Sequence, residues 1–214
     1  MKKLIYTLFA MLVITPFFAQ NNSQAKNILD KVSANYHNKS SLFLKFNSVL
    51  ENTQAKTNDS YSGEVYIKDN HYNLSIPKMD IKQIYDGKKL YTIALDQQEV
   101  TVTVPEADSD ELFTPTRVLD IYKKGYNLSM DQAKKVNGRN LTFVKLTPTV
   151  KDNIKYILVG VDQVKNELVQ LIEVNNNNTQ TTITVEKQLN DVIIPKAILT
   201  FNEAFYKDFY ISEI

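Results

Sequence analysis

Apolar residues recur along most of this chain at every second position, the pattern of strands with one buried and one solvent-facing side. In the first such run, Leu42, Leu44 and Phe46 alternate with Lys45 and Asn47. Comparable runs follow at 61–68, 72–76, 81–85, 90–95, 100–104, 126–130, 141–146, 154–161, 168–174, 181–185 and 198–201. The sequence therefore predicts a mainly β protein of about eleven strands, most of them antiparallel neighbours.

Short turn signals separate these runs. Asp86-Gly87 and Asn137-Gly138 each stand between two strand-like segments, where glycine accepts the positive φ of a tight turn, and Asn175–Asn178 is typical of a loop tip. A meander of about eleven strands normally curls or closes. We therefore expect a curved sheet with an apolar concave face.

Two segments have helical spacing instead. Ser23–Asn38 is predicted to be an amphipathic helix with Ser23 as its N-cap. Its apolar stripe consists of Ala25, Ile28, Leu29, Val32 and Tyr36. We expect this stripe to pack against the concave face of the sheet.

A second, short helix is predicted over Leu112–Lys124. Thr114 can cap it, Pro115 suits its first turn and Gly125 can end it. Its apolar stripe includes Val118, Leu119, Ile121 and Tyr122. A short helix between two runs of strands can act as a plug or lid on the concave face.

The first 19 residues have the features of a secretory signal peptide. Lys2 and Lys3 form the positive region, Leu4–Phe18 is a nearly continuous apolar run, and Ala19 is a small residue suited to cleavage. We predict cleavage before Gln20, although the cleavage bond itself stays open, and export to the periplasm. Residues 20–214 are expected to form a single domain.

Composition narrows the chemistry. The chain has no cysteine and only two histidines, His37 and His71, which do not have metal-ligand spacing. It also has no Gly-x-Ser-x-Gly elbow, no glycine-rich phosphate loop and no basic block. We expect no catalytic residues, metal or cofactor, and no nucleic-acid partner. Asp108, Asp110 and Glu111 are interpreted as a solvated acidic loop.

The order of several short motifs resembles the LolA family of periplasmic outer-membrane lipoprotein carriers. They are Leu29-Asp30-Lys31-Val32-Ser33, Gly63-Glu64-Val65-Tyr66-Ile67-Lys68, Asp86-Gly87-Lys88-Lys89-Leu90-Tyr91 and the helix after Thr114-Pro115, together with the strand that contains Phe46. Asp-Gly-Lys followed by leucine and an aromatic residue is the most specific of them. The similarity extends over nearly all of the chain after the signal peptide.

The resemblance implies an unclosed half β-barrel whose apolar concave surface is covered by helices. Such a protein takes the acyl anchor of a lipoprotein from an inner-membrane ABC transporter and passes it to the outer membrane; the outer-membrane acceptor stays open, and a monomer is expected. Family members commonly have a basic residue followed by a proline after the second strand, with an arginine implicated in control of the lid. The matching stretch here is Lys68-Asp69-Asn70, which keeps the basic residue but lacks the arginine and the proline, so whether the lid is latched stays open.

If the resemblance holds, the acyl chains contact the sheet and a lid. The expected lipid-facing sheet residues are Leu42, Leu44, Phe46, Val65, Ile67, Tyr72, Leu74, Ile76, Ile93 and Val102, and the expected lid residues are Val118, Ile121 and Tyr122. A second hypothesis is a periplasmic module of the same fold that binds free lipid or senses envelope stress. Co-purification of an acylated lipoprotein would separate the two hypotheses.

Overall fold

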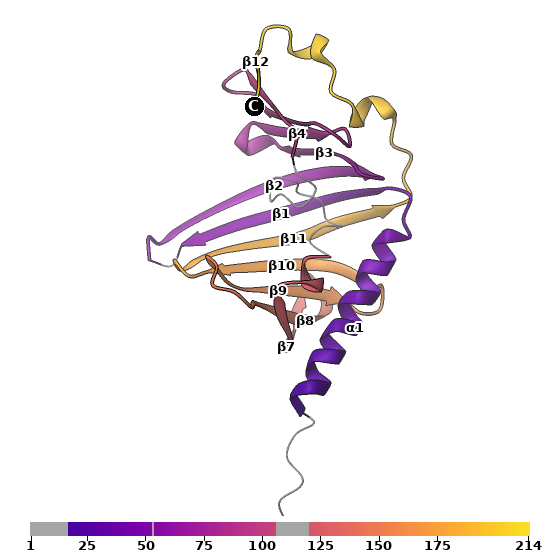
Figure 1. Cartoon of the computed structure of the whole chain (residues 1–214), viewed down its shortest axis with the longest axis vertical. Coiled ribbons are helices and arrows are strands. Elements are labelled where there is room, and N and C mark those ends of the chain that lie inside the picture. Colours follow the sequence, from indigo (N-terminus) through magenta and orange to yellow (C-terminus); the bar gives the residue numbers. More distant parts are fainter. Residues whose placement is uncertain (1–16, 53, 106–119) are drawn as a thin grey trace, which may run out of the picture.

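In the computed structural model, which describes residues 17–52, 54–105 and 120–214, one sheet of 12 strands dominates the fold. The strand order is β12-β6-β5-β4-β3-β2-β1-β11-β10-β9-β8-β7, and β12 and β7 form the two edges, so the sheet does not close. Figure 1 shows these strands crossing the molecule, with the N-terminal helix beside them. The predicted class, a mainly β unclosed half-barrel with an N-terminal helix, is confirmed.

Nearly all neighbouring strands are antiparallel, as the alternating apolar runs predicted. In chain order the strands are β1 (Leu42–Asn52), β2 (Thr57–Lys68), β3 (His71–Ile76), β4 (Ile81–Tyr85), β5 (Leu90–Ala94), β6 (Glu99–Thr103), β7 (Tyr126–Val136), β8 (Arg139–Pro148), β9 (Ile154–Asp162), β10 (Glu167–Asn175), β11 (Thr179–Asn190) and β12 (Tyr210–Glu213). Only β12, which pairs with β6, runs parallel to its neighbour.

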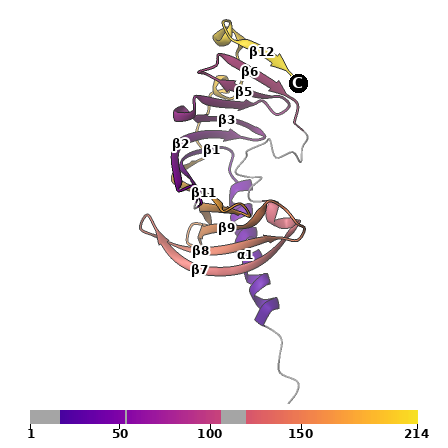
Figure 2. The same ribbon diagram turned by 90° about the vertical axis from the view of Figure 1, so that its left-hand side faces the viewer.

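The N-terminal helix α1 spans Phe17–His37 and packs against β7 and β10. It begins before Ser23, so the prediction that Ser23 caps the helix is wrong. The apolar residues Phe17 and Phe18 continue the helical segment toward the N-terminus, and local capping chemistry at Ser23 does not end it. Figure 2 shows the curvature of the sheet and α1 running beside its β7–β9 end.

The predicted hairpin turns are confirmed. Between β4 and β5, Gly87 has a φ of +90°, and the carboxylate of Asp86 accepts hydrogen bonds from the amides of Lys88 (3.0 Å) and Lys89 (2.8 Å). Asn137 and Gly138 connect β7 to β8 with φ values of +46° and +81°. Both turns use the left-handed backbone conformation that glycine and asparagine tolerate best.

The predicted second helix is wrong in the part that the structure describes. Ile121–Lys123 forms a single 3-10 turn, η2, and Lys124 has an extended backbone. Leu112–Leu119, including Val118, lies outside the described residues. The helical spacing of the stripe is therefore not sufficient to predict an α-helix as far as Lys124.

The segment after β11 also differs from the prediction. The run 198–201, predicted to be a strand, overlaps the 3-10 turn η3 (Lys196–Leu199), and a second 3-10 turn, η4 (Glu203–Tyr206), follows before β12. We call residues 191–209 the strap. Its apolar residues are explained by packing, because Phe201, Tyr206 and Phe209 cover Ile84, Ile93, Val100 and Val102 on β4, β5 and β6.

Candidate functional site

The two faces of the sheet differ in what covers them. We call the face that carries α1 the inner face and the opposite one the outer face. On the inner face the stripe of α1 joins apolar side chains from most of the strands and from η2 in one cluster. Its buried members are Ala25, Ile28, Leu29, Val32, Tyr36, Leu42, Leu44, Phe46, Val65, Ile67, Tyr72, Leu74, Leu90, Tyr122, Val144, Leu146, Ile157, Val159, Val161 and Leu168.

Cross-strand pairing sets the rows of this inner-face cluster. Leu42 lies opposite Ile67, and Ile67 lies opposite Tyr72; in the next row, Leu44 pairs with Val65. Because side chains alternate between faces along each strand, this register places every second residue of β1, β2 and β3 on the inner face. The apolar surface therefore continues across these strands, away from the strands against which α1 packs.

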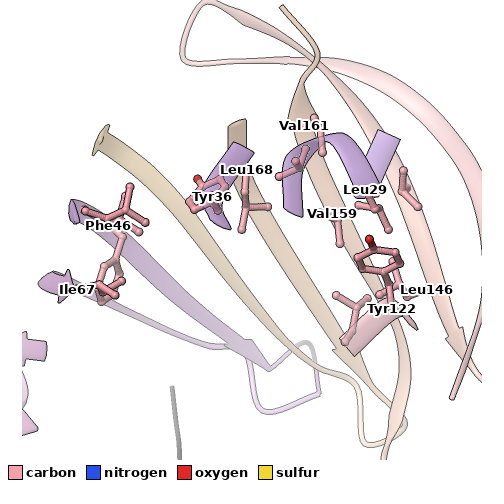
Figure 3. Close-up of a cluster of buried hydrophobic side chains, with 14 of the residues drawn as sticks. Leu29, Tyr36, Phe46, Ile67, Tyr122, Leu146, Val159, Val161 and Leu168 are labelled. Atoms are coloured by element: carbon pink, nitrogen blue, oxygen red, sulfur yellow. The ribbon is translucent and has the colours of Figure 1, made fainter. Parts of the chain in front are cut away.

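Phe46 and Gly63 approach each other closely on the inner face in β1 and β2. The two residues are register partners, and a Cβ built on Gly63 would lie 2.5 Å from Cζ of Phe46. The aromatic ring therefore covers the glycine backbone. Figure 3 shows Phe46 and Ile67 on one side of the cluster and Leu29, Tyr122, Leu146 and Val159 on the other.

Eight of the ten sheet residues predicted to face lipid belong to this cluster. Seven are buried in it, and Ile76 packs against it with partial exposure. The partly exposed members also include Leu171, Ile183 and Val185, which the sequence reasoning did not select although they lie in apolar strand runs. The alternation in 141–146 and 154–161 was the signal that could have found the residues of β8 and β9.

Ile93 and Val102 do not share this face, so the prediction that all ten residues form one surface is wrong. They lie on the outer face, in the cluster covered by the strap. On β5, Leu90 reaches the inner face, so Ile93, three residues later, points the other way. β5 has apolar residues on both faces, and the strap covers those on the outer face. Hydrophobicity alone therefore could not show which residues of β5 face inward.

Tyr36 is the last residue of the apolar stripe of α1, next to the end of the helix. Its ring is buried and its hydroxyl donates a hydrogen bond of 2.7 Å to Oε1 of Gln188 on β11. Burial raises the pKa of Tyr36 well above its ordinary value of 10.0. The hydroxyl is therefore neutral at physiological pH. Its hydrogen bond to Gln188 satisfies the polar group, so the ring can lie in the apolar face without an unpaired hydroxyl.

Polar contacts between α1 and η2 form the second feature of the site. The hydroxyl of Tyr122 donates to Oδ1 of Asp30 at 2.6 Å, and the hydroxyl of Ser33 donates to Oδ1 of Asp120 at 3.1 Å. Nε2 of His37 lies 3.5 Å from Oδ2 of Asp120. These contacts hold η2, with the buried ring of Tyr122, against the helix.

The pKa values at this junction reflect the same contacts. Partial burial and the hydrogen bond to Asp30 raise the pKa of Tyr122 above its ordinary value. Burial alone would raise the pKa of Asp30, but hydrogen bonds from Lys26 and Tyr122 hold it below its ordinary value of 3.8. Asp30 is thus a charged acceptor for Tyr122 at neutral pH. No feature of the sequence pattern had indicated this pairing.

Lys68-Asp69-Asn70, which replaces the family's arginine and proline, forms the turn from β2 to β3. Asp69 has a φ of +54°, which a proline could not adopt, and Lys68 is exposed. The side chain of Asn70 donates to the carbonyl of Gly87 in the neighbouring turn at 3.4 Å. The backbone of Lys68 pairs with His71 at the end of the β2–β3 ladder, and its side chain has no hydrogen bond or ion pair with a described residue, so this stretch serves as a turn.

The described residues place no group of three or more His, Cys, Asp or Glu side chains where they could hold a metal ion. No helix among them is long and apolar enough to cross a membrane. The main chemical property of the site is a large and mostly buried apolar cluster, bordered by a small set of polar contacts.

A family model described as outer membrane lipoprotein carrier protein LolA matches residues 15–163. The chain belongs to this family. The match covers α1 and the strands from β1 to β9, which include most of the inner-face cluster. No curated protein matches the sequence significantly.

Three solved structures are similar to this LolA-family chain, and the first of them superposes well enough to show the same fold. An uncharacterized conserved protein from Thermus thermophilus superposes with a TM-score of 0.58 at 8% identity, over 89% of this chain and 99% of that chain. A LolA superfamily protein from Nitrosomonas europaea has a TM-score of 0.46 at 11% identity, over 83% and 97% of the two chains. Lipoprotein LppX from Mycobacterium tuberculosis has a TM-score of 0.44 at 13% identity, over 81% and 98%.

Proposed function

We propose that this LolA-family protein is a periplasmic carrier that binds the acyl anchor of lipoproteins on its inner face and takes them from the inner to the outer membrane. The observation that carries the proposal is the single apolar cluster that α1, η2 and the strands share on one face of an unclosed sheet. An open sheet can offer that surface to a ligand, since no closing strand seals it.

The energetics explain why a carrier needs such a surface. Burying one methylene contributes about 0.8 kcal/mol, so an acyl chain of roughly 14 carbons represents on the order of 10 kcal/mol. A lipoprotein anchor therefore does not diffuse freely through water. The carrier has to offer comparable apolar area and still release the chains, which favours elements that exchange their own apolar contacts for those of the ligand.

The residues that we propose to contact the acyl chains are the eight sheet residues of the inner face. They are Leu42, Leu44, Phe46, Val65, Ile67, Tyr72, Leu74 and Ile76. Ile93 and Val102 are left out because the strap covers them on the outer face. The partly exposed Ile183 and Val185 of β11, next to β1 in the sheet, extend the proposed surface.

The proposed lid function is carried, among the described residues, by Ile121 and Tyr122. Tyr122 is buried in the cluster and Ile121 packs against it. Acyl chains that enter the inner face would compete with these two side chains. The hydrogen bonds of Tyr122 and Asp120 to α1 then oppose entry, because a ligand that displaces η2 has to break them.

The expected partners follow from this cycle. We propose that an inner-membrane ABC transporter loads the acylated lipoprotein and that the outer membrane receives it. The signal peptide predicted at residues 1–19 would place the protein in the periplasm, where both membranes are within reach. No catalytic step is part of the cycle, because transfer requires only differences in apolar burial.

The test is to purify the protein from the periplasm of the cell that makes it and to identify its bound material by mass spectrometry. The proposal expects lipoproteins with intact acyl anchors, and treatment that removes the anchors should abolish their retention. If the protein retains only free lipids, the lipid-binding module is correct. Retention of a protein partner without acyl chains would favour the sensing module instead.

A further inference from the structure

The end of the sheet where α1 finishes carries several loops that lie together. These are the α1–β1 connection (38–41), the β2–β3 turn, the β4–β5 turn, the β9–β10 turn (163–166) and the start of the strap. We call this end the α1-end rim; it is the right-hand side of the sheet in Figure 1. Because consecutive antiparallel strands alternate in direction, the β1–β2 and β8–β9 loops lie at the opposite rim.

Exposed lysines gather at the α1-end rim. Lys68, Lys88, Lys165 and Lys196 are all exposed, and none of them has a hydrogen bond or ion pair from its side chain to another described residue. A free ammonium group that is not committed within the protein can interact with an external anion at little reorganisation cost.

Most acidic groups of the same rim are already engaged. Asp162 and Glu167 accept from Arg139 at 2.8 Å and 2.6 Å. Asp191 accepts from the amide of Ser40 at 2.8 Å, and the carboxylate of Asp86 accepts from its own turn. Asp69 lies among the lysines with no hydrogen bond or ion pair to a described side chain. The engaged carboxylates keep their charge, but hydrogen bonds and ion pairs hold them against the protein, so most of the charged side chains of the rim that are free to meet an external group are lysines.

Two hollows lie between these loops. One, of about 450 Å³, is lined by Lys68, His71 and Lys196 together with Asp69, Asp86, Ile194, Leu199 and Thr200. The other, of about 280 Å³, brings Lys39 and Lys68 next to the end of α1 at Tyr36 and His37. Because Lys68 and Asp69 line both, the two hollows adjoin. Lysine side chains thus line both depressions, alongside Asp69 in both and Asp86 in the larger one.

Two apolar side chains project from the same rim. Val164, in the β9–β10 turn next to Lys165, is 93% exposed, and Ile193, at the start of the strap, is 98% exposed. Single exposed apolar residues are common. Val164 and Ile193 are two of the most exposed apolar residues among those described. They lie on adjacent loops, because β10 and β11 are neighbours in the sheet, and each is close in sequence to an exposed lysine, Lys165 or Lys196.

Hydrogen bonds fix the loops that present Val164 and Ile193. Oδ1 of Asp162 accepts from the amides of Val164 at 2.9 Å and Lys165 at 3.3 Å. The hydroxyl of Ser41 donates to the carbonyl of Val192 at 2.6 Å. These hydrogen bonds fix the backbone next to the two exposed apolar side chains.

We infer that the α1-end rim docks on the surface of a lipid bilayer that carries anionic headgroups. The lysines face the lipid phosphates, and Val164 and Ile193 enter the interfacial region. Charge complementarity selects this occupant, because basic residues that flank exposed apolar ones match an anionic surface above a hydrocarbon layer. The inference goes beyond the proposed carrier function. The smaller hollow borders the inner-face cluster at Tyr36, Leu42 and Ile67, but the four lysines, Val164 and Ile193 do not belong to that cluster.

Tryptophan fluorescence tests the inserted tips directly, because the chain contains no tryptophan. Val164→Trp and Ile193→Trp place a probe on the rim. Val150→Trp is the matched control, since Val150 is 74% exposed in the β8–β9 loop at the opposite rim. Each variant is purified in the form that the producing cell makes after any removal of the predicted signal peptide. With vesicles of phosphatidylcholine and phosphatidylglycerol, the two rim probes should shift to shorter wavelength and be quenched by brominated lipid, and the control should not.

Charge removal tests the other half of the inference. The triple variant Lys68→Gln, Lys165→Gln, Lys196→Gln is compared with Lys56→Gln, Lys151→Gln, Lys155→Gln, which removes the same charge from exposed residues at the opposite end of the strands. Each surface lysine contributes about fivefold to binding of an anionic membrane, so the rim variant should bind on the order of a hundredfold more weakly. The control should retain near-parent binding, and thermal melting should show that both variants are folded.

Three results would overturn the inference: no binding of the parent to anionic vesicles, equal loss in the two triple variants, or a blue shift of Val150→Trp as large as that of the rim probes. Displacement of the parent from vesicles by inorganic phosphate at matched ionic strength would also overturn it, in favour of a site for a free anion. The vesicle assays measure contacts of the rim, whereas the test of the carrier function identifies bound acyl chains, so the failure of one leaves the other standing.

Discussion

The hydroxyl of Tyr122 donates a hydrogen bond of 2.6 Å to the carboxylate of Asp30, and this contact joins η2 to the first helix. Lys26 approaches the same carboxylate at 2.7 Å from the preceding turn of the helix. The ring of Tyr122 is at the same time part of the apolar cluster on the inner face. One side chain thus couples the polar junction to the proposed acyl-binding surface.

Removing the hydroxyl should weaken this junction without opening a cavity. Tyr122→Phe is expected to lower the free energy of unfolding by about 1 kcal/mol, because a hydrogen bond to a charged group is lost and Asp30 remains partly solvated. Urea unfolding measures the change. Tyr210→Phe is the control, since Tyr210 is exposed and its hydroxyl has no hydrogen bond within the described residues. Equal effects of the two substitutions would contradict the assigned contact.

Much of the sheet follows from the sequence, because period-2 alternation is a local signal. The runs around Leu44, Val65 and Val159 became strands with those residues inward, as alternation requires. The face of Ile93 could not be predicted, because the strap that covers the outer face comes from residues more than a hundred positions later. The strand predicted at 198–201 fails for a related reason. Ile198 and Leu199 are apolar because they pack over the sheet from a 3-10 turn, and this packing depends on tertiary structure.

The junction of α1 with η2 was also beyond a sequence-based prediction. Asp30 and Tyr122 are far apart in the chain, and each fits an ordinary amphipathic helix on its own. Their pairing depends on how η2 meets the helix, which only the tertiary structure specifies. Strand β12 could not be predicted either, because it is short and pairs in parallel with β6, so no hairpin turn in the sequence indicates it.

The ion pairs of Arg139 with Asp162 and Glu167 at the α1-end rim should make the free energy of unfolding depend on pH. Desolvation would raise the pKa of Asp162, but hydrogen bonds from Arg139 and from backbone amides hold it below the ordinary value of 3.8. A lowered folded-state pKa gives stability that is present above the unfolded value and is lost as the pH falls through the folded one. The parent should therefore lose stability as the pH drops below 3.8.

Asp162→Asn tests that assignment. The variant should be less stable than the parent at neutral pH by about 3 kcal/mol, because Arg139 loses a largely buried partner. Between neutral and strongly acidic pH it should lose less stability than the parent, because the carboxylate that is protonated is absent. Urea unfolding at each pH gives both quantities, and parallel pH profiles for the two proteins would show that Asp162 does not titrate as described.

The β4–β5 turn should be sensitive to substitution at Gly87. Its φ of +90° is unfavourable for other residues, and a Cβ would lie 2.9 Å from Nδ2 of Asn70. Gly87→Val is expected to destabilise the fold by about 2 kcal/mol or more. Lys88→Val, at the next, exposed position, should change the melting temperature much less. Equal shifts in melting temperature would count against the turn geometry.

Ile121 should contribute to acyl binding if η2 borders the proposed lipid surface. Ile121→Asp places a charge among apolar side chains, which costs several kcal/mol where the site stays dry. Retention of a triacylated lipoprotein should fall accordingly. Lys124→Asp is the control, because Lys124 is exposed and has no ion pair with a described residue, whereas Lys123 pairs with Asp120 at 2.6 Å. Full retention by folded Ile121→Asp would exclude a role for η2.

Two neighbouring residues of β11 that point to opposite faces allow a direct test of whether acyl chains bind the inner face. Ile183 packs at the partly exposed border of the inner-face cluster, and Thr182 lies on the outer face, where its hydroxyl accepts from Gln180 at 3.3 Å. Ile183→Glu and Thr182→Glu therefore introduce the same charge at adjacent positions. The measurement is retention of a triacylated lipoprotein by each folded, purified variant. If acyl chains bind the inner face, Ile183→Glu should lose at least tenfold in affinity, corresponding to roughly 1.4 kcal/mol, and Thr182→Glu should keep near-parent affinity. Equal affinities in the two variants would contradict binding at the inner face.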